Sequence, residues 1–312
     1  MTSSQKPKRK NTLPAIATGI GFAAIWITVS HHLSEKPSTD SEEVSKPTQS
    51  RSVSVPPLNP TIVQFRERED RSYRDLATLL RSLPEELSVS DTKALTDWLL
   101  NGAEQQITDV GQHAHLVNEV LNLLRAQTPL PENLPDVVLT LAESASQPDL
   151  VRDYAFQQMR PLWSEIENQD QKIKLQDALW EAVDSKHATR SGTAFLALHS
   201  LGYREGITPE GERALGDQDF QPRVRAILTS EESPMSLQMT ALRIVEERSL
   251  SSELDLVREV LNQPSLNIAM KLKAISVIAQ HGNESDRTLL AELQVQPILK
   301  PALDRAMKSL PQ

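Results

Sequence analysis

Histidines are the first side chains to weigh for chemistry, because histidine binds metals and exchanges protons near neutral pH. Gly111-Gln-His-Ala-His115 places two of them two residues apart. On a helix this spacing turns His113 and His115 about 200° apart, so they cannot share one metal ion. We interpret the segment as the solvated start of a helix. The other histidines predict no metal centre either: they are the polar pair His31-His32 and the isolated His187, His199 and His281.

Carboxylates are numerous enough to form acid/base pairs, the chemistry of a hydrolase or lyase. Glu231-Glu232 and Glu246-Glu247 are adjacent in sequence. The members of each pair therefore point apart on a helix, and we interpret both pairs as solvated surface. The sequence contains no cysteine, no phosphate loop, no His-Glu-x-x-His and no Gly-x-Ser-x-Gly motif. It therefore predicts no catalytic, metal-binding or cofactor-binding residue. Enzyme activity stays open, with binding favoured over catalysis.

Three tryptophans offer a possible aromatic binding surface. Trp98, Trp163 and Trp180 each lie on an apolar helical stripe, so we predict that they pack in the core. The low aromatic content, 4% of the chain, fits a core built from alanine and leucine.

The elements expected to carry these side chains are helices. From Thr61 onward apolar residues recur at three- and four-residue spacing, and no alternating β-branched stretch predicts a strand. Proline or a capping residue begins several of these segments, and Gly202, Gly216 and Gly282 stand where helices should end. The predicted apolar stripes are Leu95/Trp98/Leu99, Val117/Val120/Leu121/Leu124, Leu150/Tyr154/Ala155/Met159/Leu162, Leu175/Leu179/Trp180/Val183 and Leu272/Ile275/Ala279.

Several of these helical segments resemble one another. One segment, Asp149–Ala155, has a Val-Arg pair and an alanine three residues after the arginine. Another, Gly192–Gly202, alternates small and large residues and ends in glycine. A third, Met270–Asp286, has such a helix followed by a glycine turn and an acidic loop. Alanines recur within them at 155, 194, 241 and 274. Alanine at such positions lets paired helices approach closely.

These segments, over about residues 140–295, resemble HEAT repeats, the helical hairpins of α-solenoids. The resemblance implies a stack of antiparallel hairpins and a scaffold that binds other proteins along an extended surface. The uneven spacing of the alanines departs from a regular superhelix, so an irregular all-α domain remains the alternative.

Residues 13–30 predict a membrane anchor. Leu13–Val29 is uncharged and meets the lower length limit of a spanning helix, about 17 residues. Lys6, Lys8, Arg9 and Lys10 precede it, which favours a cytoplasmic N-terminus and an extracytoplasmic body. A cleaved signal peptide and a buried soluble helix are the alternatives, and Thr28-Val29-Ser30 is a poor cleavage site.

The chain is therefore predicted to have four parts: a basic cytoplasmic tail (1–12), a transmembrane anchor (13–30), a Pro/Ser-rich linker (31–60) and an all-α, HEAT-like repeat domain (61–312). The net charge is −9 despite the basic tail, which argues against a nucleic-acid partner. We expect a membrane-anchored scaffold that binds a protein partner on the extracytoplasmic side, periplasmic if the source is Gram-negative, with no cofactor. An envelope enzyme or enzyme accessory built on an α-helical toroid, and a structural spacer, are the alternatives.

Overall fold

The computed structural model describes residues 56–67, 71–101, 109–202, 215–264, 266–293 and 297–311. Every described residue belongs to one unit, residues 53–312. The predicted tail and anchor, and almost all of the predicted linker, thus lie outside the described residues. Pro60, assigned to the linker on sequence grounds, is the first residue of a helix.

Over the described residues this unit is all-α, with fourteen α-helices, one short 3₁₀ helix and no strand. The prediction of an all-α fold is therefore confirmed for that part of the chain. The helices are α1 (Pro60–Arg66), α2 (Tyr73–Arg81), α3 (Val89–Asn101), α4 (Val110–Arg125), α5 (Leu134–Glu143), α6 (Asp149–Glu165), α7 (Gln169–Asp184), α8 (Arg190–Gly202), α9 (Asp217–Thr229), α10 (Met235–Arg248), η2 (Ser251–Glu253), α11 (Leu254–Leu261), α12 (Ile268–His281), α13 (Asp286–Glu292) and α14 (Lys300–Ser309).

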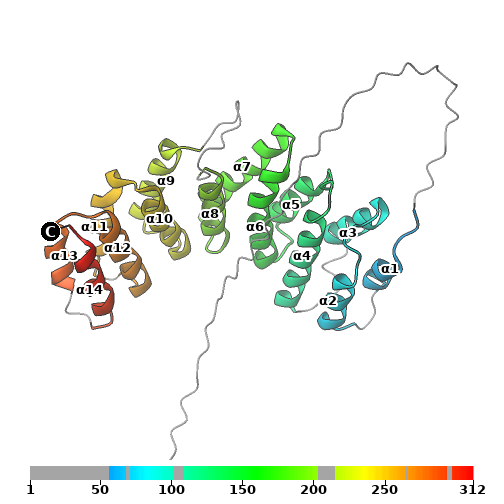
Figure 1. Ribbon diagram of the computed structural model, residues 1–312, viewed down its shortest axis with the longest axis horizontal. Helices are drawn as coiled ribbons and strands as arrows, with labels where there is room; N and C mark the ends of the chain where they lie inside the picture. Colours follow the sequence, from blue (N-terminus) through cyan, green and yellow to red (C-terminus); the bar gives the residue numbers. More distant parts are fainter. Residues whose placement is uncertain are drawn as a thin grey trace, which may run out of the picture. The chain divides into compact units, whose positions relative to one another are not determined.

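The helices pack as successive hairpins, α1/α2 through α13/α14 (Figure 1). Each even-numbered helix also packs against the next even-numbered helix, from α2 to α14, which makes a continuous row. Odd-numbered helices form the second row, in which α1, α3, α5 and α7 pack in succession and α9 packs on α11. The domain is thus a stack of helices in two layers.

Neighbouring even-numbered helices run parallel, as contacts between α4 and α6 illustrate. Tyr154 Oη lies 3.4 Å from His115 Nδ1 near the start of both helices. Gln158 Nε2 donates to Asn118 Oδ1 at 2.9 Å in the middle. Arg125 Nη1 pairs with Glu165 Oε1 at 3.0 Å where both helices end. The loops that follow even-numbered helices therefore gather along one edge of the stack, and the turns inside hairpins gather along the other.

Small side chains line the row of even-numbered helices. Ala155, Ala194, Ala241 and Ala274 lie one each on α6, α8, α10 and α12, and all are fully buried. The sequence prediction that these recurring alanines allow close helix packing agrees with their burial.

Two predicted stripes are wrong in part. Leu150 and Leu272 are 38% and 37% exposed, although both were assigned to apolar faces. In α12 the buried apolar residues are Met270, Ala274, Ile275, Val277 and Ile278, and Lys271 is buried beside them. These residues recur at helical spacing from Met270 onward, and Leu272 lies outside that face. The predicted stripe included Leu272 because it stands three residues before Ile275.

Two of the three glycines stand at helix ends as expected, and the third does not. Gly282 follows α12 as predicted, and Gly202 is the last residue of α8. Gly216 instead precedes α9 as its N-cap, where its N–H donates to Asp219 Oδ2 at 3.0 Å. The prediction that Gly216 ends a helix is therefore wrong, because the capping carboxylate three residues later makes it a helix start.

Gly192 offers a direct test of close packing between α8 and α10. A Cβ added there would lie 3.0 Å from the backbone oxygen of Ser236. We expect Gly192→Val to destabilise the protein by about 1–3 kcal/mol, because the neighbour is backbone and cannot rotate away. The urea midpoint measures the loss. Gly111→Val is the matched control, since a Cβ there would meet only the Asp109 side chain; equal losses in both variants would contradict the packing argument.

Candidate functional site

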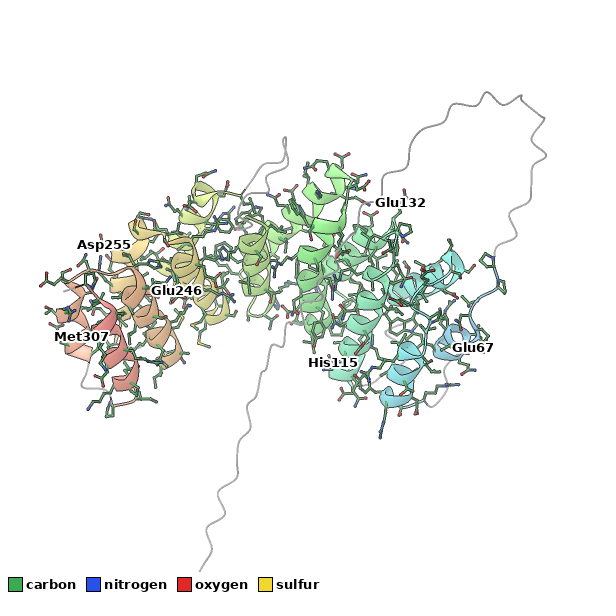
Figure 2. The ribbon with its side chains drawn as sticks, in the orientation of Figure 1. Glu67, His115, Glu132, Glu246, Asp255 and Met307 are labelled. Carbon is green, nitrogen blue, oxygen red and sulfur yellow. The ribbon has the colours of Figure 1, made fainter. Side chains whose placement is uncertain are left out.

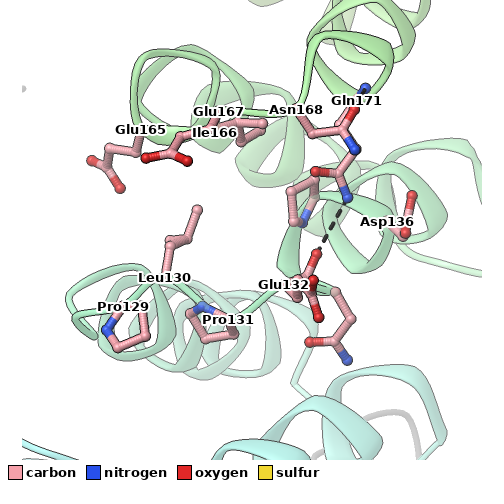
Figure 3. Close-up of a pocket in the computed structure, with 12 residues that line it drawn as sticks. Pro129, Leu130, Pro131, Glu132, Asp136, Glu165, Ile166, Glu167, Asn168 and Gln171 are labelled. Atoms are coloured by element: carbon pink, nitrogen blue, oxygen red, sulfur yellow. Dashed lines mark hydrogen bonds between the residues drawn. The ribbon is translucent and has the colours of Figure 1, made fainter. Parts of the chain in front are cut away.

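A surface pocket of 660 Å³ lies where the loop between α4 and α5 faces the loop between α6 and α7 (Figure 3). We call it the acidic pocket. It lies on the edge of the stack where the even-numbered helices end. Glu132 belongs to the loop between α4 and α5, and His115 lies near the start of α4 (Figure 2). Its lining consists of Pro129, Leu130, Pro131, Glu132, Asn133, Pro135, Asp136, Glu165, Ile166, Glu167, Asn168 and Gln171.

Local sequence explains why this loop pair is well defined. Pro135 occupies the first turn of α5, where its fixed backbone suits a helix start. Asn168 caps α7 by accepting from the N–H groups of Asp170 and Gln171 at 2.9 and 3.2 Å. Gln171 Nε2 then donates to the backbone oxygen of Glu132 at 3.2 Å and ties the two loops together (Figure 3).

The pocket combines negative charge with apolar surface. Its charged lining residues are four carboxylates: Glu132, Asp136, Glu165 and Glu167. Leu130 extends from one loop toward the other (Figure 3), and three prolines line the same pocket. Arg125 reaches Glu165 from α4, so one of the four carboxylates already has a cationic partner. The arrangement suits a positively charged, partly apolar ligand.

All four carboxylates are solvent-exposed. A catalytic acid/base pair needs one carboxyl group whose surroundings favour its protonated form, which burial usually provides. Exposed carboxylates remain hydrated, and salt screens their attraction for a cationic ligand. Their charge and exposure are compatible with binding a cation.

A second pocket of 450 Å³ adjoins the first, and Glu165 lines both. It lies at the ends of α4, α6 and α8 and contains Arg125, Arg160 and Trp163. The Trp163 ring already holds a cation, since Lys172 Nζ lies 4.8 Å from its centroid. Trp163 is half-buried, whereas Trp98 is buried against Phe65 with ring centroids 4.8 Å apart. The prediction of core packing thus describes Trp98 better than Trp163.

A buried polar cluster lies between α8, α9 and α10. His199 is 1% exposed, and its Nε2 lies 2.7 Å from Glu247 Oε2. Arg248 Nε donates to His199 Nδ1 at 3.0 Å, which assigns the ring proton to Nε2. Arg248 also pairs with Asp217 at 3.1 Å, and its guanidinium lies 4.0 Å from the Phe220 ring centroid. These contacts fix the three helices relative to one another.

The surroundings of His199 favour its neutral form. Burial lowers the pKa of His199 below 6.5, the Arg248 charge lowers it further, and the hydrogen bond with Glu247 opposes both. Burial would raise the pKa of Glu247, but hydrogen bonds from Arg243 and His199 outweigh it and lower that pKa. The lowered pKa favours the neutral form of His199, whose ring is held between Glu247 and Arg248, and every contact described is internal to the fold.

The carboxylate pairs differ from the sequence prediction. Glu246 extends from α10 to Lys273 of α12, with which it forms an ion pair, and accepts from Ser276 Oγ at 2.6 Å (Figure 2). Glu247 contacts His199 and Arg243. The interpretation of Glu246-Glu247 as solvated surface is therefore wrong, because adjacent residues on a helix can bridge to two different neighbouring helices. Glu231 and Glu232 are exposed as predicted.

The histidine pair in α4 follows the predicted geometry. His113 is buried and His115 is exposed, so the two side chains point to different sides of the helix. The described residues bring together no group of three or more His, Asp or Glu side chains that could hold a metal ion. His281 Nε2 lies 2.7 Å from the backbone oxygen of Glu246, and His187 lies 3.5 Å from Asp149.

Sequence analysis did not identify the acidic pocket. A usable signal was present in the loops: Pro131-Glu132 and Pro135-Asp136 each place a carboxylate after a proline, and Glu165-Ile-Glu167 places two carboxylates around the end of α6. Binding residues concentrate in loops positioned by a rigid scaffold. The missing information was that loops about forty residues apart face each other.

No known family model matches this sequence, and no curated protein matches it significantly. No helix within the described part of the chain is both long and apolar enough to cross a bilayer. The predicted anchor, residues 13–30, lies outside that part.

We expect stability to fall as pH drops from 6.5 toward the lowered pKa of His199. In this window the unfolded chain binds a proton at position 199 that the folded protein excludes, and the loss is complete below the folded pKa. Urea unfolding between pH 7.5 and 5.0 measures the slope. His199→Gln keeps hydrogen-bonding capacity but does not titrate, so it should flatten the slope.

The same slope in wild type and His199→Gln would assign the pH dependence to other groups. Asp286, Glu246 and Glu247 also have lowered pKa values, but their stabilisation is lost only as pH falls below their ordinary values of 3.8 to 4.5. The two pH windows are therefore separable.

Proposed function

We propose that this protein is a membrane-anchored, HEAT-like helical-repeat scaffold that binds a partner protein through a positively charged segment. The acidic pocket is the observation that carries the proposal: four exposed carboxylates surround apolar surface on one edge of the stack. A flexible Lys/Arg-rich segment with apolar residues fits this chemistry. Steering by the carboxylates would speed its association at low salt.

The arrangement of helices supports a scaffold. Stacked hairpins expose successive loops along each edge, which suits contact with an extended chain. The two neighbouring pockets span α4 to α8 along one edge and share Glu165. The second pocket also contains Arg125 and Arg160, so the positively charged side chains of the segment would lie in the acidic pocket. The HEAT assignment rests on the paired helices and on the buried alanines of the even-numbered row.

The alternative of an envelope enzyme draws on the same pocket, since it contains several carboxylates. Their exposure favours binding over acid/base chemistry. A structural spacer would need no charged pocket, so that alternative predicts that charge reversal in the pocket changes nothing.

The partner is tested by chemical crosslinking of the full-length chain in native membranes, followed by purification. We expect a stoichiometric protein partner that is lost when residues 61–312 are deleted. Glu132→Lys/Glu167→Lys should weaken capture strongly, because it replaces two attractive charges by repulsive ones. Capture should also decline as salt rises.

Glu259→Lys/Glu284→Lys is the matched control, since both glutamates are exposed and lie on or beside α11 and α13, outside the pocket lining. Equal capture by the two double variants would overturn the role of the acidic pocket. Failure to capture any partner would favour the spacer or the enzyme.

The anchor is tested by extraction of membranes with alkaline carbonate. We expect the full-length chain to remain in the membrane fraction. Ile20→Arg should release much of it, because an arginine at the centre of a spanning segment costs roughly 2.5–3.5 kcal/mol. Ser45→Arg, in the predicted linker, should leave the fraction unchanged. Release of the wild-type protein would favour a cleaved signal peptide instead.

A further inference from the structure

Two arginines share a small cavity on the other edge of the stack, where the turns inside hairpins gather. The cavity has a volume of 120 Å³ and lies between the end of α5, the start of α6, the end of α7 and the start of α8. Arg152 comes from the first turn of α6, and Arg190 is the first residue of α8. Its lining residues are Ala142, Glu143, Arg152, Phe156, Ala178, Glu181, Ala182, Ser185 and Arg190.

The two guanidinium groups differ in how they are satisfied. Arg152 Nε donates to the backbone oxygen of Ala142 at 2.9 Å, and its Nη2 lies 3.4 Å from that of Glu143. These bonds hold Arg152 against the end of α5. Arg190 Nη1 is buried and has no hydrogen-bond acceptor among the described residues. A buried charged donor without an acceptor is costly, and native structures rarely tolerate it without a ligand or solvent to accept the bond.

Burial and a neighbouring positive charge also act on the Arg190 guanidinium. Burial lowers the pKa of Arg190, and the positive charge of Arg152 lowers it further, while Asp149 partly offsets both. Glu143 and Glu181 also line the cavity, but both are exposed, whereas Arg190 Nη1 is buried. An anion beside Arg190 and Arg152 would accept the open hydrogen bond.

We propose that Arg152 and Arg190 form a binding site for a single oxyanion group, a phosphate or a carboxylate. A water molecule occupies about 30 Å³ in the liquid, so a cavity of 120 Å³ suits one small group such as a phosphate or a carboxylate. Arg152 presents a fixed guanidinium, and Arg190 supplies the donor that lacks an acceptor. The site is independent of the scaffold function proposed above, because it lies on the opposite edge and has the opposite charge preference.

Thermal unfolding of the full-length protein tests the proposal. Inorganic phosphate and acetate are titrated separately at constant ionic strength set with sodium chloride. We expect a saturable rise in the unfolding temperature of the wild type with one or both anions, since a ligand that binds only the folded state stabilises it. A response to phosphate alone identifies a phosphoryl ligand, and a response to acetate identifies a carboxylate.

The variants separate a site from a general salt effect. Arg190→Gln should weaken the apparent affinity for the anion by about tenfold to a hundredfold, because it removes a hydrogen bond from a charged donor. Arg305→Gln, an exposed arginine of α14, is the matched control and should respond like wild type. Without added anion, Arg190→Gln should be at least as stable as wild type, because it removes the buried charge that lacks an acceptor. Equal responses in all three proteins, or no response to either anion, would overturn the proposal.

Discussion

Close approach of the even-numbered helices is the constraint on which the rest of the structure depends. A single helical hairpin cannot bury its apolar face, so stability requires that each hairpin pack on the next. Ala155, Ala194, Ala241 and Ala274 provide the small surfaces for this packing, and all four are fully buried. Gly192 extends the same principle to direct contact with the backbone of α10. Loops and pockets can vary along both edges as long as this row stays closely packed.

The uneven repeat spacing has a structural counterpart in the polar contacts between successive hairpins. Such contacts join residues 40 apart between α4 and α6, as in Arg125–Glu165. They are 48 apart between α8 and α10, as in His199–Glu247, where a long connection precedes α9. They shorten to 30 between α12 and α14, as in Ser309 Oγ to Ala279 O. Ala194 and Ala241, on α8 and α10, are also widely spaced in the sequence. The even-numbered helices still pack in succession, so the irregularity reflects loop and helix length rather than a loss of stacking.

Local sequence predicted the helices well because helix starts and apolar periods depend on residues within a few positions. It failed where a distant neighbour decides the outcome. Leu272 has the spacing of a buried residue but faces solvent, and Glu246 looks solvated but pairs with Lys273. Ser249 ends α10 in the left-handed region with a φ of 54°, where a glycine would have been the usual signal. The acidic pocket could not be predicted, because Glu132 and Gln171 meet only once α4 and α6 are aligned side by side.

Helix geometry explains two polar contacts on opposite edges of the stack. Arg152 contacts the carbonyl groups at the end of α5, where a cation interacts favourably with the helix dipole. Asp136, in the first turn of α5, interacts favourably with the opposite end of the same helix. The dipoles do not sort all charges by edge, because carboxylates also line the cavity of Arg152 and arginines line the pocket beside the acidic one. The chemistry of each hollow therefore follows from the particular residues that neighbouring hairpins bring together.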